Sequence, residues 1–338
     1  MGDFVNGLRT AFCDRLGIDV PIVQAPVGSA AGPELVAAVS GAGGLGMLAL
    51  TWQSPAQAQR SIRRTRELTT RPFGANLVLD FPVDDVLTVC LDEGVPLIST
   101  FWGDPAPVNA RIRGAGALHL HTVGEIAEAV DAVARGVDVV VAQGWEAGGH
   151  VRGGTSTMAL VPAVVDAVAP VPVLAAGGIA DGRGVAAALA LGAQGAVLGT
   201  RFLAAVEAAT HEVYRQHLIA ATGSDTVHTR CFDDGWPDAP HRALRNATLR
   251  RWEAAGSPSA PQRPGEGDIL AVDAAGNEHH RYEDLMPLPG MTGDLADMAL
   301  YAGQSVNLVR DVIPAAQLIR DLAAQAATTI DRLHSAAM

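Results

Sequence analysis

Hydrophobic positions follow two alternating patterns over the first 200 residues. Short, continuous apolar runs are typical of strands buried on both faces, and Ala-rich amphipathic stretches are typical of helices packed on such strands. The expected strands are residues 20–24, 45–48, 73–78, 96–100, 117–121, 137–142, 172–175 and 195–198. The expected helices are residues 33–40, 55–67, 84–93, 105–113, 123–135, 158–168 and 182–191. This alternation with short links predicts an α/β fold, a (β/α)₈ TIM barrel rather than an open sheet.

The pattern changes after residue 206. Residues 207–289 are richer in aromatic, charged and proline residues, most clearly at 257–264. We expect this segment to form a smaller inserted domain after strand eight that covers the substrate at the barrel mouth. Helical patterns return at 304–310 and 314–333. The predicted organisation is a barrel made of residues 1–206 and 290–338, with a small substrate or lid domain at 207–289.

Composition and charge narrow the location and the partners. No apolar run reaches the roughly 20 residues that a membrane span needs, and residues 1–15 lack the apolar centre of a signal peptide. We therefore expect a cytoplasmic protein without membrane contact. The formal net charge of −12 argues against nucleic acid as a partner. The sequence does not decide the oligomeric state, which leaves a homo-oligomer open.

Two absences in the sequence exclude several classes of chemistry. All 24 basic residues are arginine, so neither a lysine Schiff base nor a Walker-type phosphate loop is present. The three cysteines, Cys13, Cys90 and Cys231, are far apart, so they indicate neither a disulfide framework nor an iron–sulfur cluster. Redox chemistry would therefore need an organic cofactor or a metal held by histidine and carboxylate.

The loop at residues 143–154 is the leading candidate for an active site. It follows a buried strand, at the end where α/β barrels carry their catalytic groups. It contains five glycines and little side-chain bulk, so its backbone is expected to lie close to another group. His150 is the candidate catalytic base, because imidazole exchanges a proton near neutral pH; a histidine without function is the alternative. Glu146 is expected either to orient His150 or to cap a turn.

Two further glycine-rich turns leave the last two strands. Gly177 and Gly178 follow strand seven, and Gly199 and Thr200 follow strand eight. In barrels these adjacent turns commonly hold a phosphate with backbone N–H groups and a helix N-terminus. A phosphate there suggests a mononucleotide such as FMN. The G-x-G-x-x-G sequence at 41–46 lies between a helix and a strand, the reverse of the order in a dinucleotide fingerprint, so we assign it to a tight turn.

Three histidines raise the question of a metal. His119 and His121 face the same side of one expected strand and, with His150, could form a triad. No acidic fourth ligand stands at a strand end, so we predict no metal. His121 is nearer the carboxyl end of its strand and is the one expected to reach a pocket. Trp145, Trp236 and Tyr301 are aromatic candidates for the substrate pocket, with core packing as the alternative.

Several segments together resemble the nitronate monooxygenase (2-nitropropane dioxygenase) family of FMN-dependent barrels. They are residues 21–26, 42–46, 73–77, 142–150, 175–182, 199–202 and 301–306. The resemblance implies FMN as cofactor and His150 as the residue that faces the substrate. The residues that it implies near the flavin are Ala25, Pro26, Val27, Asn76, Gln143, Gly148, Tyr301, Gly303, Gln304 and Ser305, with Gly178, Gly199 and Thr200 at its phosphate.

The resemblance implies a reaction and leaves an alternative. The implied activity is oxidation of alkyl nitronates or nitroalkanes with O₂ to carbonyl compounds and nitrite, with His150 as base. Val27 replaces a frequent methionine, and residues 155–161 resemble FMN-dependent enoyl-acyl-carrier-protein reductases. The alternative is therefore an NAD(P)H-using reductase of enoyl thioesters or quinones. A third hypothesis, from another class, is a barrel that binds a phosphorylated ligand without redox chemistry, or a metal hydrolase.

Overall fold

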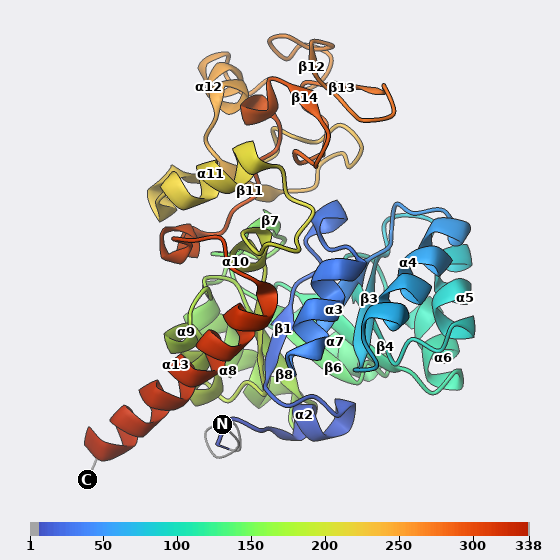
Figure 1. Ribbon diagram of the computed structural model, residues 1–338, viewed down its shortest axis with the longest axis vertical. Helices are drawn as coiled ribbons and strands as arrows, with labels where there is room; N and C mark the ends of the chain where they lie inside the picture. The colour runs from blue at the N-terminus through green and yellow to red at the C-terminus, as the bar shows by residue number, and fades with distance from the viewer. Residues whose placement is uncertain (1–6, 337–338) are drawn as a thin grey trace.

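Eight parallel strands form a closed barrel in the computed structural model, which describes residues 7–336 (Figure 1). The strands are β1 (Ile22–Gln24), β2 (Gly46–Ala49), β3 (Phe73–Val78), β4 (Leu97–Phe101), β5 (Leu118–Val123), β6 (Val139–Gln143), β8 (Val173–Ala176) and β9 (Ala196–Leu198). Neighbours pair in chain order from β2 to β9, and β9 then pairs with β1. A parallel bridge between Val23 and Leu45 joins β1 to the start of β2 and closes the ring. The predicted (β/α)₈ TIM barrel is confirmed.

Helices surround the barrel and bury its outer face. They are α3 (Pro33–Gly41), α4 (Pro55–Leu68), α5 (Asp84–Asp92), α6 (Ala106–Gly114), α7 (Ile126–Ala134), α8 (Thr157–Val168), α9 (Gly182–Ala190), α10 (Thr200–Leu203) and α13 (Ala315–Ala336). Because α10 is only one turn long, the C-terminal helix α13 packs beside α9 and α3 in the place of an eighth helix (Figure 1). A Cβ on Gly182 would lie 2.5 Å from the α13 backbone, so glycine permits this close packing.

The barrel interior is filled by apolar side chains. Val23, Leu120 and Leu174 pack there with side chains from the other strands. Helix α2 (Ala11–Leu16) adds Phe12 and Cys13 to the same cluster, both fully buried. This leaves the carboxyl ends of the strands as the end of the barrel where a site can form.

An inserted segment lies beyond those carboxyl ends, drawn in yellow to orange in Figure 1. Its elements are α11 (Glu212–Ala220), η2 (Gly223–Asp225), β10 (Thr226–Thr229), β11 (His241–Leu244), α12 (Ala247–Ala254), β12 (Ile269–Val272), β13 (Glu278–His280), β14 (Thr292–Gly293) and η3 (Leu295–Asp297). Met291, Leu295 and Met298 still pack against Leu270 of the insert. Residues on both sides of the predicted boundary at 289 thus share one apolar cluster, and the division into a barrel and a lid domain stays a prediction.

One strand joins the insert to the barrel loop. The short strand β7 (Gly149–His150) pairs antiparallel with β11, so that His150 lies opposite His241. The sequence did not predict this strand, because two residues carry no periodicity. It also predicted an α-helix at 304–310, where the structure has the 3₁₀ helix η4 (Gln304–Leu308).

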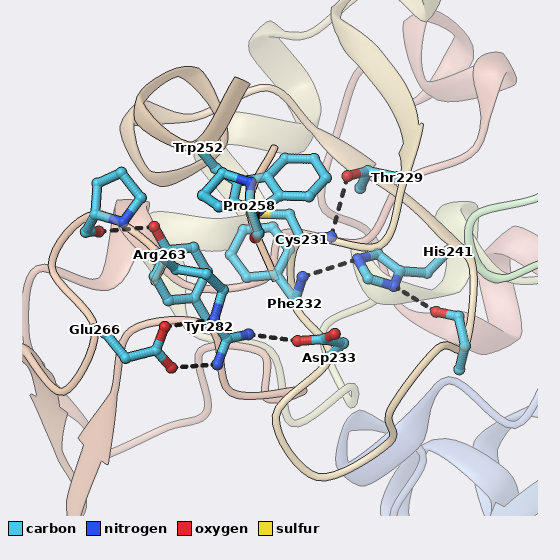
Figure 2. A network of polar contacts seen from close by, with 12 residues as sticks. Thr229, Cys231, Phe232, Asp233, His241, Trp252, Pro258, Arg263, Glu266 and Tyr282 are labelled. Atoms are coloured by element: carbon cyan, nitrogen blue, oxygen red, sulfur yellow. Dashed lines mark hydrogen bonds and ion pairs between the residues drawn. The ribbon is translucent and has the colours of Figure 1, made fainter. Parts of the chain in front are cut away.

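A buried arginine holds the core of the insert together. Figure 2 shows Arg263 between Asp233 and Glu266, with its guanidinium 4.5 Å from the centre of the Tyr282 ring. The Arg263 side chain is 5% exposed, so its charge depends on these two carboxylates. The same network ends near His241, whose ring packs on His150.

We predict that Arg263→Ala lowers the free energy of unfolding by about 2–3 kcal/mol, less than the full cost of breaking a buried ion pair, because both carboxylates are partly exposed. Urea unfolding measures this change. Arg64→Ala is the matched control, since Arg64 pairs with Glu34 and Glu67 at the surface and its loss should leave stability nearly unchanged. Equal effects of the two substitutions would contradict the structural role of Arg263.

Candidate active site

A cavity of about 650 Å³ opens at the carboxyl ends of the barrel strands. Loops after β1, β6, β8 and β9 line it, together with the insert and the segment that follows Tyr301. Most of the residues predicted from the sequence meet there. They are Ala25, Pro26, Val27, Asn76, Gln143, Gly148, His150, Gly177, Gly178, Gly199, Thr200, Tyr301, Gly303 and Ser305.

His121 was expected to reach the pocket, but it is not among the residues that line the cavity. Its Nδ1 lies 2.8 Å from Thr100 Oγ1, which also lies 2.8 Å from His119 Nε2. Burial lowers the pKa of His121 to about 3 and that of His119 to about 4. Both are therefore neutral histidines of the barrel wall. No cluster of potential metal ligands occurs within residues 7–336.

Trp145 and Gln304 also lie outside the cavity lining. The Trp145 ring packs against His228, at 4.1 Å between ring centres, and the guanidinium carbon of Arg242 lies 5.1 Å from the centre of the Trp145 ring. The Gln304 N–H donates to the Glu146 carbonyl oxygen at 2.9 Å. Both residues therefore pack within the protein, outside the cavity. Their positions do not support the predictions that Trp145 contacts the substrate and that Gln304 contacts the flavin.

The loop after β6 and the segment after Tyr301 touch backbone to backbone. A Cβ on Gly148 would lie 2.4 Å from the Gly303 nitrogen, and one on Gly303 would lie 2.8 Å from the Glu146 oxygen. The Gly303 N–H donates to Thr200 Oγ1 at 3.0 Å. Gly148 is thus required by the packing of two protein segments, and it also lines the cavity.

Glu146 caps helix α8 and does not orient His150. Its Oε2 accepts hydrogen bonds from the Thr157 N–H at 2.8 Å and from the Thr157 hydroxyl at 2.9 Å. A carboxylate at a helix N-terminus is favoured by the free N–H groups and by the helix dipole. Of the two roles expected for Glu146, the cap is the one that the structure has.

His150 is enclosed by aromatic rings. The Trp236 ring packs on it at 4.0 Å between ring centres and 31°, while Trp102 meets it edge-on at 6.1 Å. The ring centres of Tyr301 and His241 lie 5.8 and 5.4 Å from that of His150. Burial lowers the pKa of His150 well below its ordinary value, and His241 lowers it further. The imidazole is therefore neutral at neutral pH and its proton-accepting form predominates.

Within residues 7–336, Asp284 is the acidic residue with an oxygen less than 4 Å from a His150 nitrogen, and the sequence did not single it out. Its Oδ2 lies 3.8 Å from His150 Nε2, and its Oδ1 accepts a hydrogen bond from the Tyr301 hydroxyl. Burial raises the pKa of Asp284 to about 7, although the hydrogen bond from Tyr301 opposes this shift. No motif surrounds Asp284 in the expected lid segment. Its role could not be predicted from the sequence, because only the fold brings residue 284 close to residue 150.

The barrel, the glycine turns and the enclosed histidine match a known family. The sequence model of nitronate monooxygenases matches residues 9–86 and 81–325. The chain belongs to the nitronate monooxygenase family. Members of this family are oxidoreductases and flavoproteins, so this chain is an oxidoreductase too, and the expected family resemblance is confirmed.

The similar proteins include one nitronate monooxygenase and others whose names give different activities. A nitronate monooxygenase of Paraburkholderia phytofirmans is 32% identical over 96% of this chain and 97% of its own length. The (3aS,4S,5R,7aS)-5-hydroxy-7a-methyl-1-oxo-octahydro-1H-indene-4-carboxyl-CoA dehydrogenase of Rhodococcus jostii is 36% identical over 75% of this chain and 70% of its own. The structure of FabK from Thermotoga maritima superposes with a TM-score of 0.83, at 33% identity, over 97% of this chain and 99% of that one.

The residues around the cavity fit the flavin that the family implies. Gln143 Oε1 is buried and has no hydrogen-bond partner within residues 7–336, so it can accept a hydrogen bond from a ligand N–H in the cavity. The Gln143 side-chain nitrogen is already bound to the His150 carbonyl at 3.1 Å. A flavin ring offers an N–H donor of this kind, and its phosphate fits the turns at Gly178 and Thr200.

The expected phosphate site differs from the sequence prediction in one respect. Asp181 caps helix α9, accepting hydrogen bonds from the Arg183 and Gly184 N–H groups at 3.0 and 3.2 Å. The N-terminus of α9 is therefore already occupied by a carboxylate. Gly177 and Gly178, with φ of 97° and 71°, and the Thr200 hydroxyl remain as the groups that would contact a phosphate.

We predict that Gly148→Ala lowers the free energy of unfolding by about 1–3 kcal/mol, the usual range for a side chain forced into packed space. The atoms in its way are backbone atoms, which cannot move aside alone. Gly154→Ala in the same loop is the control, because a Cβ there meets nothing within 4 Å. Thermal and urea unfolding compare the two. Equal stability of Gly148→Ala and Gly154→Ala would contradict the close backbone contact between Gly148 and Gly303.

Proposed function

We propose that this protein is an FMN-dependent nitronate monooxygenase that converts alkyl nitronates or nitroalkanes and O₂ into carbonyl compounds and nitrite. The carrying observation is the neutral, aromatic-enclosed His150 on the wall of a cavity that fits a flavin. Bound FMN would supply a two-electron acceptor that O₂ can reoxidise. The partners are then a small-molecule substrate and O₂.

His150 serves in this proposal as the catalytic base. A nitroalkane is a carbon acid, and a neutral imidazole is suited to take its α-proton. Trp236 and Trp102 keep water from the ring, so the base remains unprotonated over the physiological pH range. Ala25, Pro26, Val27 and Asn76, which also line the cavity, would contact the flavin.

The charge of the cavity wall favours a neutral substrate. Asp234, Glu283 and Asp284 line the cavity, and its lining contains no arginine within residues 7–336. A site with carboxylates and no fixed cation repels an approaching anion. The neutral nitroalkane, deprotonated after binding, therefore fits this wall better than the nitronate anion formed in solution.

A second candidate is an FMN-dependent reductase that takes electrons from NAD(P)H, of the enoyl-acyl-carrier-protein reductase or quinone reductase type. Residues 155–161 resemble the former class. The likeness to FabK and to a dehydrogenase of a CoA thioester supports the same class of reaction. Anaerobic reduction of the flavin by NADH or NADPH would favour this candidate over the first.

We predict that His150→Ala retains FMN and loses turnover of neutral nitroalkanes by about 100-fold or more, the usual scale for a general base. Oxygen consumption and nitrite release measure turnover, and the absorbance of the released cofactor measures FMN content. His217→Ala is the control, since His217 is exposed on α11 and distant from the lining. Full activity of His150→Ala would remove His150 from the mechanism.

A further inference from the structure

Three side chains from different parts of the chain form a row that begins at His150. His150 lies on β7, Asp284 follows β13 in the insert, and Tyr301 stands where the chain leaves the insert. His150 Nε2 and Asp284 Oδ2 are 3.8 Å apart, and the Tyr301 hydroxyl donates to Asp284 Oδ1. His150 and Asp284 side chains are only 10% and 11% exposed, so water screens their interaction weakly.

We propose that Asp284 is a positioning residue that stabilises the imidazolium formed when His150 takes a proton from the substrate, with Tyr301 fixing the carboxylate. This inference rests on the proposed function, in which His150 is the base. A buried imidazole gains a full charge in that step, and an unpaired buried charge is strongly unfavourable. An adjacent carboxylate removes most of that cost, as in other histidine–carboxylate pairs.

Among residues 7–336, Asp284 is the carboxylate that lies within 4 Å of a His150 nitrogen. His241 faces the ring, but its Nδ1 lies 3.0 Å from the Ala239 oxygen and its Nε2 accepts from the Phe232 N–H. Both of its nitrogens are thus committed to the insert. Glu146 is bound to Thr157 at the start of α8. The carboxylate of Asp284 is therefore the available counter-charge within residues 7–336.

The geometry assigns a role to each ring nitrogen. His150 Nε2 is fully buried, faces Asp284 and has no hydrogen-bond partner within the described residues. The pair needs to approach by only about 1 Å to form a hydrogen bond. In the proton transfer the substrate C–H bond breaks and an Nδ1–H bond forms, while the electron pair stays on the substrate as its nitronate. Nε2–H then donates to Asp284, and no further reactant is needed.

The inference has a definite pH dependence. Asp284 must be ionised to pair with the imidazolium, and its pKa is about 7, while the pKa of His150 lies well below its ordinary value. Activity with neutral nitroalkanes should therefore be present above pH 7 and decline as the pH falls through 7. The other titratable groups facing the pair or next to it are His241 on β11, Asp234 beside the Trp236 loop, Tyr301, His279 and Glu283.

The test compares two substrates in the full-length flavin-loaded protein. We predict that Asp284→Asn lowers kcat/KM for nitroethane by at least about tenfold, whereas it changes kcat/KM for pre-formed ethyl nitronate by less than threefold, because that anion has no proton to give. The rise in activity near pH 7 should disappear in the same variant. Asp238→Asn is the control, since Asp238 lies in the same insert but is exposed and outside the lining.

Each outcome has a separate meaning. An equal loss with both substrates, or no loss with either, overturns the role of Asp284 while leaving the proposed function intact. No turnover of either substrate by the wild type overturns the proposed function. Tyr301→Phe, which removes only the hydroxyl that orients the carboxylate, should reproduce a smaller loss confined to nitroethane.

A second readout needs no activity. In the folded protein Asp284 retains its proton up to pH 7, whereas in the unfolded chain it loses it near pH 4. The folded state therefore binds more protons between these values, and stability falls as the pH rises through this window. Asp284→Asn should raise the Tm relative to wild type more at pH 8 than at pH 4. An equal Tm difference at both pH values overturns the proposed ionisation of Asp284.

Discussion

The active site depends on a contact between two backbones in which no side chain fits. Gly148 and Gly303 bring the loop after β6 against the segment that follows the insert, and Gln304 and Thr200 add hydrogen bonds on either side. This contact fixes the direction in which the loop leaves the barrel. It thereby places His150 in β7, where it can pair with β11 of the insert. The barrel loops and the insert both contribute residues to the cavity wall, and the insert encloses His150.

Two titratable groups are buried at this site at a cost to stability. A neutral histidine and an acid with a raised pKa lie side by side, under aromatic rings that exclude water. Neither group gains stability from its position in the free protein. In the proposed reaction, proton transfer to His150 would make it a cation, and its attraction to the Asp284 carboxylate would then stabilise both groups. Such groups, which burial disfavours until the reaction occurs, are typical of sites that move protons.

Sequence patterns predicted the barrel well and the histidine side of the cavity poorly. Strand periodicity located β3 at residues 73–78, because a buried parallel strand is a continuous apolar run. Glycine turns after β8 and β9 and the loop after β6 were found because their composition is unusual. The two-residue strand β7 and Asp284 carry no such signal, since their importance comes from pairing with residues that are distant in sequence. The packing of Gly148 against the backbone of residues 302 and 303 was not predicted, because it joins segments that are distant in sequence.

In the proposed reaction, electrons enter the protein from a nitro compound rather than from a nicotinamide. Anaerobic mixing of the purified yellow protein with nitroethane, and separately with NADH or NADPH, tests this claim directly by the flavin absorbance. We expect that nitroethane alone bleaches the flavin, that O₂ restores its colour, and that neither nicotinamide bleaches it at a comparable rate. Rapid bleaching by NADH or NADPH, with none by nitroethane, would contradict it and favour the reductase.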